Sequence, residues 1–174
     1  MRKSVITLLF LSLMWTSASA DMKQVRAIEK EYEKVAEAIT MAEDDEMTRN
    51  MATINVDQMW PGSGRHKEEI TLYFDLETNA EGFSNRLIAA HHKYNIGAEE
   101  FELEYLFDAA NASCPSLCVA KERRADCRFY FVDGKFHKRS KSKLPVSYFT
   151  NPPEILKDAA RIYRIFECTI VQNH

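Results

Sequence analysis

The chain has 174 residues, a formal net charge of −3 and 45% hydrophobic residues. This length is typical of one domain with one hydrophobic core. The mildly acidic charge argues against general nucleic-acid binding, which favours a strongly basic surface. We therefore expect a globular protein with no nucleic-acid partner.

Residues 1–20, MRKSVITLLFLSLMWTSASA, have the three parts of a secretory signal peptide. Two basic residues begin it, an apolar core follows, and Ala18-Ser19-Ala20 supplies the small side chains that precede cleavage. The apolar core is shorter than the roughly 20 residues that span a bilayer. We expect a secreted or periplasmic protein with no membrane span after cleavage, and a single domain over residues 21–174.

Residues 22–42 show the apolar spacing of an amphipathic helix. The apolar side chains recur at steps of three and four, at Val25, Ile28, Tyr32, Val35 and Ile39. Most positions between them are charged, including Glu29, Lys30, Glu31, Glu33 and Lys34. The pattern predicts a helix with one buried stripe.

After residue 50 the apolar period changes to two, which is typical of half-buried β-strands. We expect strands in ATINVDQM (52–59), EEITLYFDLE (68–77), NRLIAAHHKYNI (85–96), AEEFELEYLFD (98–108), 117–121 and CRFYFVDGKFHKR (127–139). The expected turns are WPGSGRH (60–66), Asn95-Ile96-Gly97 and Asp133-Gly134. Such short connections favour antiparallel hairpins.

The segment NPPEILKDAARIYRIFEC (151–168) predicts a second helix, with Asn151 as its N-cap and two prolines in its first turn. Residues 169–171 are compatible with either helix or strand. The order of elements predicts an α+β fold. In it, an N-terminal amphipathic helix packs on a curved antiparallel β-meander of about five to six strands, and a C-terminal helix follows. We expect both helices to cover one face.

Four cysteines are present, at Cys114, Cys118, Cys127 and Cys168. An exported chain meets oxidising conditions, which favour disulfides, although free thiols and a metal site stay open as alternatives. The spacing lacks the CxxC unit of common zinc and redox sites. Disulfide bracing is the favoured interpretation, with Cys118 and Cys127 as the preferred pair across a short hairpin.

Several segments together resemble a family of small secreted proteins from gut-dwelling Gram-negative anaerobes, whose function is uncharacterised. They are the leader, the amphipathic helix, EITLYFDLE, HHKYNIGAEEFELEYLFD and CRFYFVDGKF. The resemblance implies export and a helix-plus-meander fold. It carries no catalytic residues over to this chain, and it does not extend to the cysteine cluster.

The adjacent His91 and His92 are the most evident candidate metal ligands, but neighbours on a strand point to opposite faces. We therefore expect no metal site there. Glu100, Glu102 and Glu104 alternate with the apolar residues of their strand, so they lie on its other face. We interpret them as the solvated face of the sheet, paired with Lys or Arg on a neighbouring strand.

Between residues 121 and 143 there are nine Lys or Arg and three Asp or Glu. Such a basic segment is a candidate site for an anionic glycan or lipid headgroup, and equally a solvated loop. The candidate ligand-binding residues are Lys135, Lys138, Arg139, Lys141 and Lys143.

We expect an exported, non-enzymatic binding or interaction protein whose partner is a protein or one of these anionic groups. The aromatic residues expected to be exposed as interface anchors are Tyr73, Tyr94, Tyr130 and Trp60. The alternative is a small secreted hydrolase with a cavity inside a cone-shaped fold and His92 or a sheet-facing carboxylate as general base. A structural role in the cell envelope is a third hypothesis. No GxSxG elbow or Gly-rich phosphate loop is present, so we assign no catalytic residue and expect no cofactor.

Overall fold

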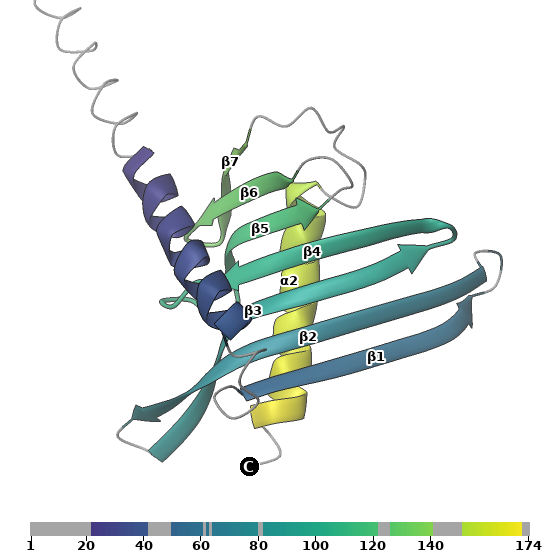
Figure 1. Ribbon diagram of the computed structural model, residues 1–174, viewed down its shortest axis with the longest axis horizontal. Helices are drawn as coiled ribbons and strands as arrows, with labels where there is room; N and C mark the ends of the chain where they lie inside the picture. The colour runs from purple at the N-terminus through teal and green to yellow at the C-terminus, as the bar shows by residue number, and fades with distance from the viewer. Residues whose placement is uncertain are drawn as a thin grey trace, which may run out of the picture.

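The computed structural model in Figure 1 describes residues 22–41, 50–60, 62, 64–79, 82–121, 126–140 and 151–171. The predicted signal peptide, residues 1–20, lies outside the described residues. An N-terminal helix spans 22–41, as its apolar stripe predicts. Among the described residues, no helix is both long enough and apolar enough to cross a membrane.

Seven strands follow in one antiparallel sheet whose spatial order equals the chain order, β1-β2-β3-β4-β5-β6-β7. Their bounds are β1 Asn50–Trp60, β2 Gly64–Asn79, β3 Gly82–Ile96, β4 Glu99–Phe107, β5 Pro115–Lys121, β6 Cys127–Val132 and β7 Lys135–Arg139. The α+β class and the antiparallel meander are thus confirmed. The expected count of five to six strands is too low, because the five residues after Asp133-Gly134 pair with β6 as an edge strand.

The turns set the register of the sheet. Asp133 and Gly134 both have positive φ, 51° and 70°, which matches the two-residue hairpin turn that suits the strand twist. The turn between β3 and β4 is Gly97-Ala98, with Gly97 at φ 61°. It lies later than the predicted Asn95-Ile96-Gly97, because Ile96 still pairs with Glu99.

The two helices lie on opposite faces of the sheet, which corrects the expectation that both cover one face (Figure 1). The N-terminal helix packs its apolar stripe on a small cluster formed by Leu106, Leu117, Val119 and Tyr130. The C-terminal helix, α2, packs on the other face against the larger core. The reason lies in β4 and β5, which carry buried residues at successive positions and so need cover on both faces.

Helix α2 spans Pro152–Phe166. The Asn151 side chain accepts a 3.1 Å hydrogen bond from the Glu154 backbone N–H, which confirms the predicted N-cap. Its buried stripe consists of Ile155, Ala159, Ile162 and Phe166. The tail continues as one π-helical turn over Glu167–Val171, which excludes the strand alternative for residues 169–171.

Candidate functional site

A cluster of charged side chains joins the sheet to α2 around the buried His92, whereas the Arg161 side chain at its edge is 40% exposed. The His92 ring on β3 lies between two carboxylates: its Nδ1 is 2.8 Å from Asp158 Oδ2, and its Nε2 is 2.9 Å from Glu68 Oε1. Arg161 contacts both Glu68 and Asp158, and the Tyr105 hydroxyl donates a 2.8 Å hydrogen bond to Asp158 Oδ2. We call His92, Glu68, Asp158 and Arg161 the buried ion cluster.

The contacts within the buried ion cluster favour the ionised carboxylates and the protonated form of His92. Burial by itself raises the pKa of Glu68, but hydrogen bonds from His92 and Arg161 outweigh it and lower that pKa to about 2. The pKa of Asp158 is lowered in the same way, against burial, chiefly by its hydrogen bond with His92. Burial lowers the pKa of His92, yet its bonds to Asp158 and Glu68 raise it above the usual value.

An aromatic stack extends from this cluster towards the β3–β4 turn. The His92 and Tyr94 rings are stacked with centroids 4.5 Å apart, and Tyr94 and Phe101 follow at 5.1 Å. A protonated imidazole over the Tyr94 ring is a favourable cation–aromatic arrangement. The stack therefore links the buried charges to the half-buried aromatic pair at the end of the sheet.

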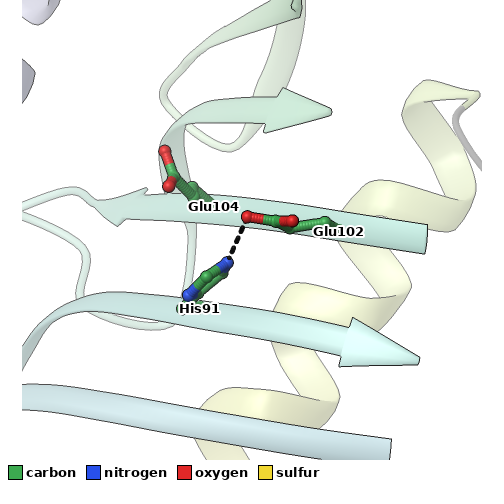
Figure 2. Close-up of side chains that lie close together, drawn as sticks. All are labelled: His91, Glu102 and Glu104. Carbon is green, nitrogen blue, oxygen red and sulfur yellow. Dashed lines mark hydrogen bonds and ion pairs between the residues drawn. The ribbon is translucent and has the colours of Figure 1, made fainter. Parts of the chain in front are cut away.

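The opposite face carries a second polar group, built from His91 on β3 and Glu102 and Glu104 on β4 (Figure 2). His91 Nε2 is 2.9 Å from Glu102 Oε1, and one potential ligand atom from each of the three residues lies within 4.8 Å of the others. Lys121 Nζ contacts Glu104 and lies 3.8 Å from Glu102. We call His91, Glu102 and Glu104 the His91 site.

The N-terminal helix also reaches the His91 site. The Tyr32 hydroxyl donates a 2.5 Å hydrogen bond to Glu104 Oε2. Burial first, and then this bond to an ionised carboxylate, raises the pKa of Tyr32 above its usual value. One oxygen of Glu104 is thus occupied by Tyr32 and the other faces Lys121.

An open cavity of about 1500 Å³ lies at the end of the sheet where the β3–β4 turn projects. Its described walls come from the seven strands and include the Tyr94 and Phe101 pair, Leu103 and Phe129. Seven acidic and four basic residues also line it. Of the buried ion cluster, only Glu68 is among the described lining residues, and His92 lies behind the wall.

The histidine and glutamate predictions are partly confirmed. His91 and His92 do face opposite sides of the sheet, as strand geometry requires. The expected Lys partner of the glutamate row is Lys121 on β5. Glu102 and Glu104 are half-buried, however, and of the three only Glu100 is exposed.

The basic segment is described only in part. Lys135, Lys138 and Arg139 lie on β7, whereas Lys141 and Lys143 lie outside the described residues. Lys138 Nζ is 3.6 Å from Met22 Sδ of the N-terminal helix, and the Arg139 guanidinium lies over the Phe129 ring, 5.9 Å from its centroid. Two of the three described candidate ligand-binding residues therefore pack against the protein itself.

The predicted disulfide is absent from the structure. All four cysteines are described, and all four are free thiols. Cys118 pairs with Phe129 and Cys127 pairs with Ala120, so the preferred partners are diagonal neighbours on one face. Diagonal positions are about 7–8 Å apart, which exceeds the usual Cα–Cα span of a disulfide.

The expected aromatic anchors are mostly buried. Tyr73 and Tyr130 are 7% and 5% exposed, because each faces the side of the sheet that the N-terminal helix covers. Tyr94 is half-buried within its stack. The side chain of Trp60 lies outside the described residues. The three described side chains, Tyr73, Tyr94 and Tyr130, therefore do not form a flat exposed aromatic surface.

Sequence reasoning missed both polar groups. The His91 site follows from the register of the β3–β4 hairpin, where His91 pairs with Glu104 and Lys93 with Glu102. The signal in the sequence is the pair Gly97-Ala98, because a two-residue turn there places His91 opposite Glu104. The buried ion cluster had no such signal, because it depends on how α2 packs on the sheet.

Comparison of the chain with protein-family models, with curated proteins and with solved structures finds no match.

Proposed function

We propose that this chain is an exported, non-enzymatic binding protein that holds a basic, partly apolar peptide segment of a partner protein in the open cavity. The observation that carries the proposal is the composition of that cavity. It combines the stacked Tyr94 and Phe101 rings with an excess of acidic over basic side chains. Aromatic side chains are frequent anchors of protein interfaces, and complementary charge guides association.

The buried ion cluster supports this proposal because it fixes the wall of the cavity. Tyr94 stacks on His92, and His92 is bonded to residues of both β2 and α2. A binding surface held in one arrangement before the partner arrives loses less entropy on binding. Rigid aromatic rings at the cavity therefore favour tight recognition.

The hydrolase alternative receives less support from the geometry. A general base needs a free lone pair within reach of the substrate proton. Both ring nitrogens of His92 contact carboxylates, and these contacts raise its pKa, which favours the protonated ring. The cavity is open and does not include His92 among its described lining residues.

The anionic-ligand hypothesis also receives less support. The charge excess of the open cavity repels a phosphate, sulfate or carboxylate group. On β7, Lys138 and Arg139 already contact Met22 and Phe129. A basic peptide therefore fits the described charges better than an anionic glycan or lipid headgroup.

Fluorescence anisotropy with two dye-labelled peptides tests the proposal. One peptide alternates Lys with Phe and Leu, and its matched control carries Glu at every Lys position. We expect the basic peptide to bind, and its affinity to fall as the salt concentration rises. Its affinity for Phe101→Ala should be at least tenfold lower than for the wild-type protein. Phe136→Ala is the control variant, because that ring is exposed on β7 and is not among the described lining residues.

Equal binding of both peptides, or equal affinity of the wild-type protein and Phe101→Ala, contradicts the proposed site. Glu99→Gln is a second variant that leaves the core intact, since Glu99 is exposed beside the turn. It should lower the affinity for the basic peptide several-fold and leave the free energy of unfolding unchanged within about 0.5 kcal/mol. Export is checked separately: N-terminal sequencing of the mature protein should begin at Asp21.

A further inference from the structure

We propose that the His91 site binds a divalent transition-metal ion, with Zn²⁺ as the representative case. Its three side chains come from adjacent strands and lie on one face of the sheet. Figure 2 shows the His91 imidazole reaching from β3 to Glu102, with Glu104 two residues further along β4. A nitrogen and two carboxylate oxygens are a donor set that zinc accepts.

The spacing of the donor atoms is close to what such an ion needs. Ligands about 2.0–2.2 Å from a tetrahedral ion lie roughly 3.3 Å from one another. In the structure His91 Nε2 and Glu102 Oε1 are 2.9 Å apart, and all three donors lie within 4.8 Å. Small side-chain rotations therefore suffice to enclose an ion, without any movement of the backbone.

The site already attracts a positive charge. Lys121 Nζ contacts Glu104 Oε1 and lies 3.8 Å from Glu102 Oε1. A metal ion must displace this ammonium, whose side chain is 36% exposed and carried on a flexible stem that can turn to solvent.

Tyr32 of the N-terminal helix orients the third ligand. Its hydroxyl holds Glu104 Oε2, which leaves Oε1 directed at the position that Lys121 now contacts. Hydrogen bonds from such neighbours commonly fix the orientation of metal-ligating carboxylates. The three protein ligands leave a fourth position for water, which is typical of open rather than purely structural zinc sites.

Isothermal titration of tag-free protein with ZnCl₂ tests the proposal. We expect one Zn²⁺ per chain, and dissociation constants at least tenfold higher for His91→Ala and Glu102→Gln. Lys121→Gln should bind Zn²⁺ roughly fivefold or more tightly, because the competing ammonium is gone. Glu100→Gln is the matched control: it removes a carboxylate from the same strand face, next to the site, and should leave the affinity unchanged.

Two outcomes overturn the proposal. The first is Zn²⁺ binding that ignores His91→Ala and Glu102→Gln, or that weakens in Lys121→Gln. The second is loss of Zn²⁺ binding in Cys114→Ser/Cys168→Ser, which assigns the ion to thiols. Mg²⁺ in tenfold excess should not compete, since it prefers oxygen ligands. The gain in Lys121→Gln cannot arise from misfolding. Glu102 and Lys121 also line the open cavity, but no peptide is present in this titration, so its failure leaves the peptide proposal standing.

Discussion

His92 and Asp158 are 66 residues apart in the chain, yet Nδ1 of the imidazole and Oδ2 of the carboxylate are 2.8 Å apart. His92 lies on β3 and Asp158 on α2. This contact therefore joins the C-terminal helix to the sheet. It also favours the charged form of both groups in a place where only 3% of the His92 surface is exposed.

Replacement of His92 by Gln should destabilise the fold strongly. The substitution leaves Glu68 and Asp158 with Arg161 but without the buried imidazole that they share, and the loss of one member of a buried pair costs about 3–5 kcal/mol. Urea unfolding followed by circular dichroism measures the change. His91→Gln is the matched control, one residue away on the opposite face, and should cost less than about 1 kcal/mol. Equal losses in the two variants contradict the role of the buried ion cluster.

The free energy of unfolding should be greatest in weakly acidic solution. The folded-state pKa of Glu68 is depressed to about 2, so its contribution is complete above its ordinary pKa of 4.5 and is lost as the pH falls towards 2. The folded-state pKa of His92 is raised above 6.5, so its contribution is complete below pH 6.5 and is lost as the pH rises through the raised value.

Thermal unfolding from pH 2 to pH 9 tests both losses of stability, the acid limb from Glu68 and the alkaline limb from His92. The midpoint should fall on both sides of a maximum between about pH 4.5 and 6.5. In His92→Gln the alkaline limb should flatten, because the titrating imidazole is gone. An alkaline limb that persists unchanged in this variant assigns the effect to another group.

Glu29 should control the ionisation of Tyr130. The Tyr130 hydroxyl and the Arg128 guanidinium both donate hydrogen bonds to Glu29 of the N-terminal helix. Burial, and then this bond to Glu29, raises the pKa of Tyr130 to about 12. In Glu29→Gln we expect that pKa to fall part of the way towards 10, since the contribution of burial remains.

Ultraviolet absorbance at about 295 nm, recorded against pH, follows tyrosinate formation directly. The spectrum should show one tyrosine ionising earlier in Glu29→Gln than in the wild-type protein. Glu31→Gln is the control on the same helix, because no described hydrogen bond joins Glu31 to Tyr130. A shift of equal size in both variants points to general loss of helix charge instead.

Thiol reactivity should follow burial. Cys168 is exposed, Cys114 is half-buried, and Cys118 and Cys127 are 0% and 4% exposed. Burial also raises the pKa of the Cys118 thiol, which makes its reactive thiolate scarcer. We expect Ellman's reagent to modify Cys168 first and the two buried thiols only after unfolding.

The total thiol count decides between the structure and the expectation from sequence. Four thiols per unfolded chain without reductant agree with the free cysteines of the structure. Two thiols per unfolded chain instead reveal a disulfide, which is what an oxidising compartment favours. Cys168→Ser should remove the fastest reacting thiol and leave the rest of the time course unchanged.

Much of the fold was predictable because its signals are local. The alternation in EEFELEYLF places Leu103 and Tyr105 on one face and Glu102 and Glu104 on the other, and the structure agrees. Asp133-Gly134 is a hairpin turn because both positions need positive φ, which Gly accepts readily and Asp tolerates better than most residues. The stripe of α2 appears in the sequence and is the buried face of the helix.

The candidate sites were predictable only in part, for a physical reason that differs between them. The His91 site depends on the register of the β3–β4 hairpin, because register controls which side chains face each other. That register is set by a turn at Gly97-Ala98 and not at the predicted Asn95-Ile96-Gly97. The buried ion cluster depends on Asp158 and Arg161, which the sequence pattern places on an ordinary polar helix face. Nothing local distinguishes these two residues from solvated ones.

By itself, the sequence determined where strands and helices form, which side chains share a strand face, and where most turns lie. These features follow from backbone geometry and turn chemistry over a few residues. Only the tertiary structure decided that the two helices take opposite faces, that Cys118 and Cys127 are diagonal neighbours, and that Asp158 meets His92. Such contacts join residues far apart in the chain, so they depend on how whole elements pack rather than on any local pattern.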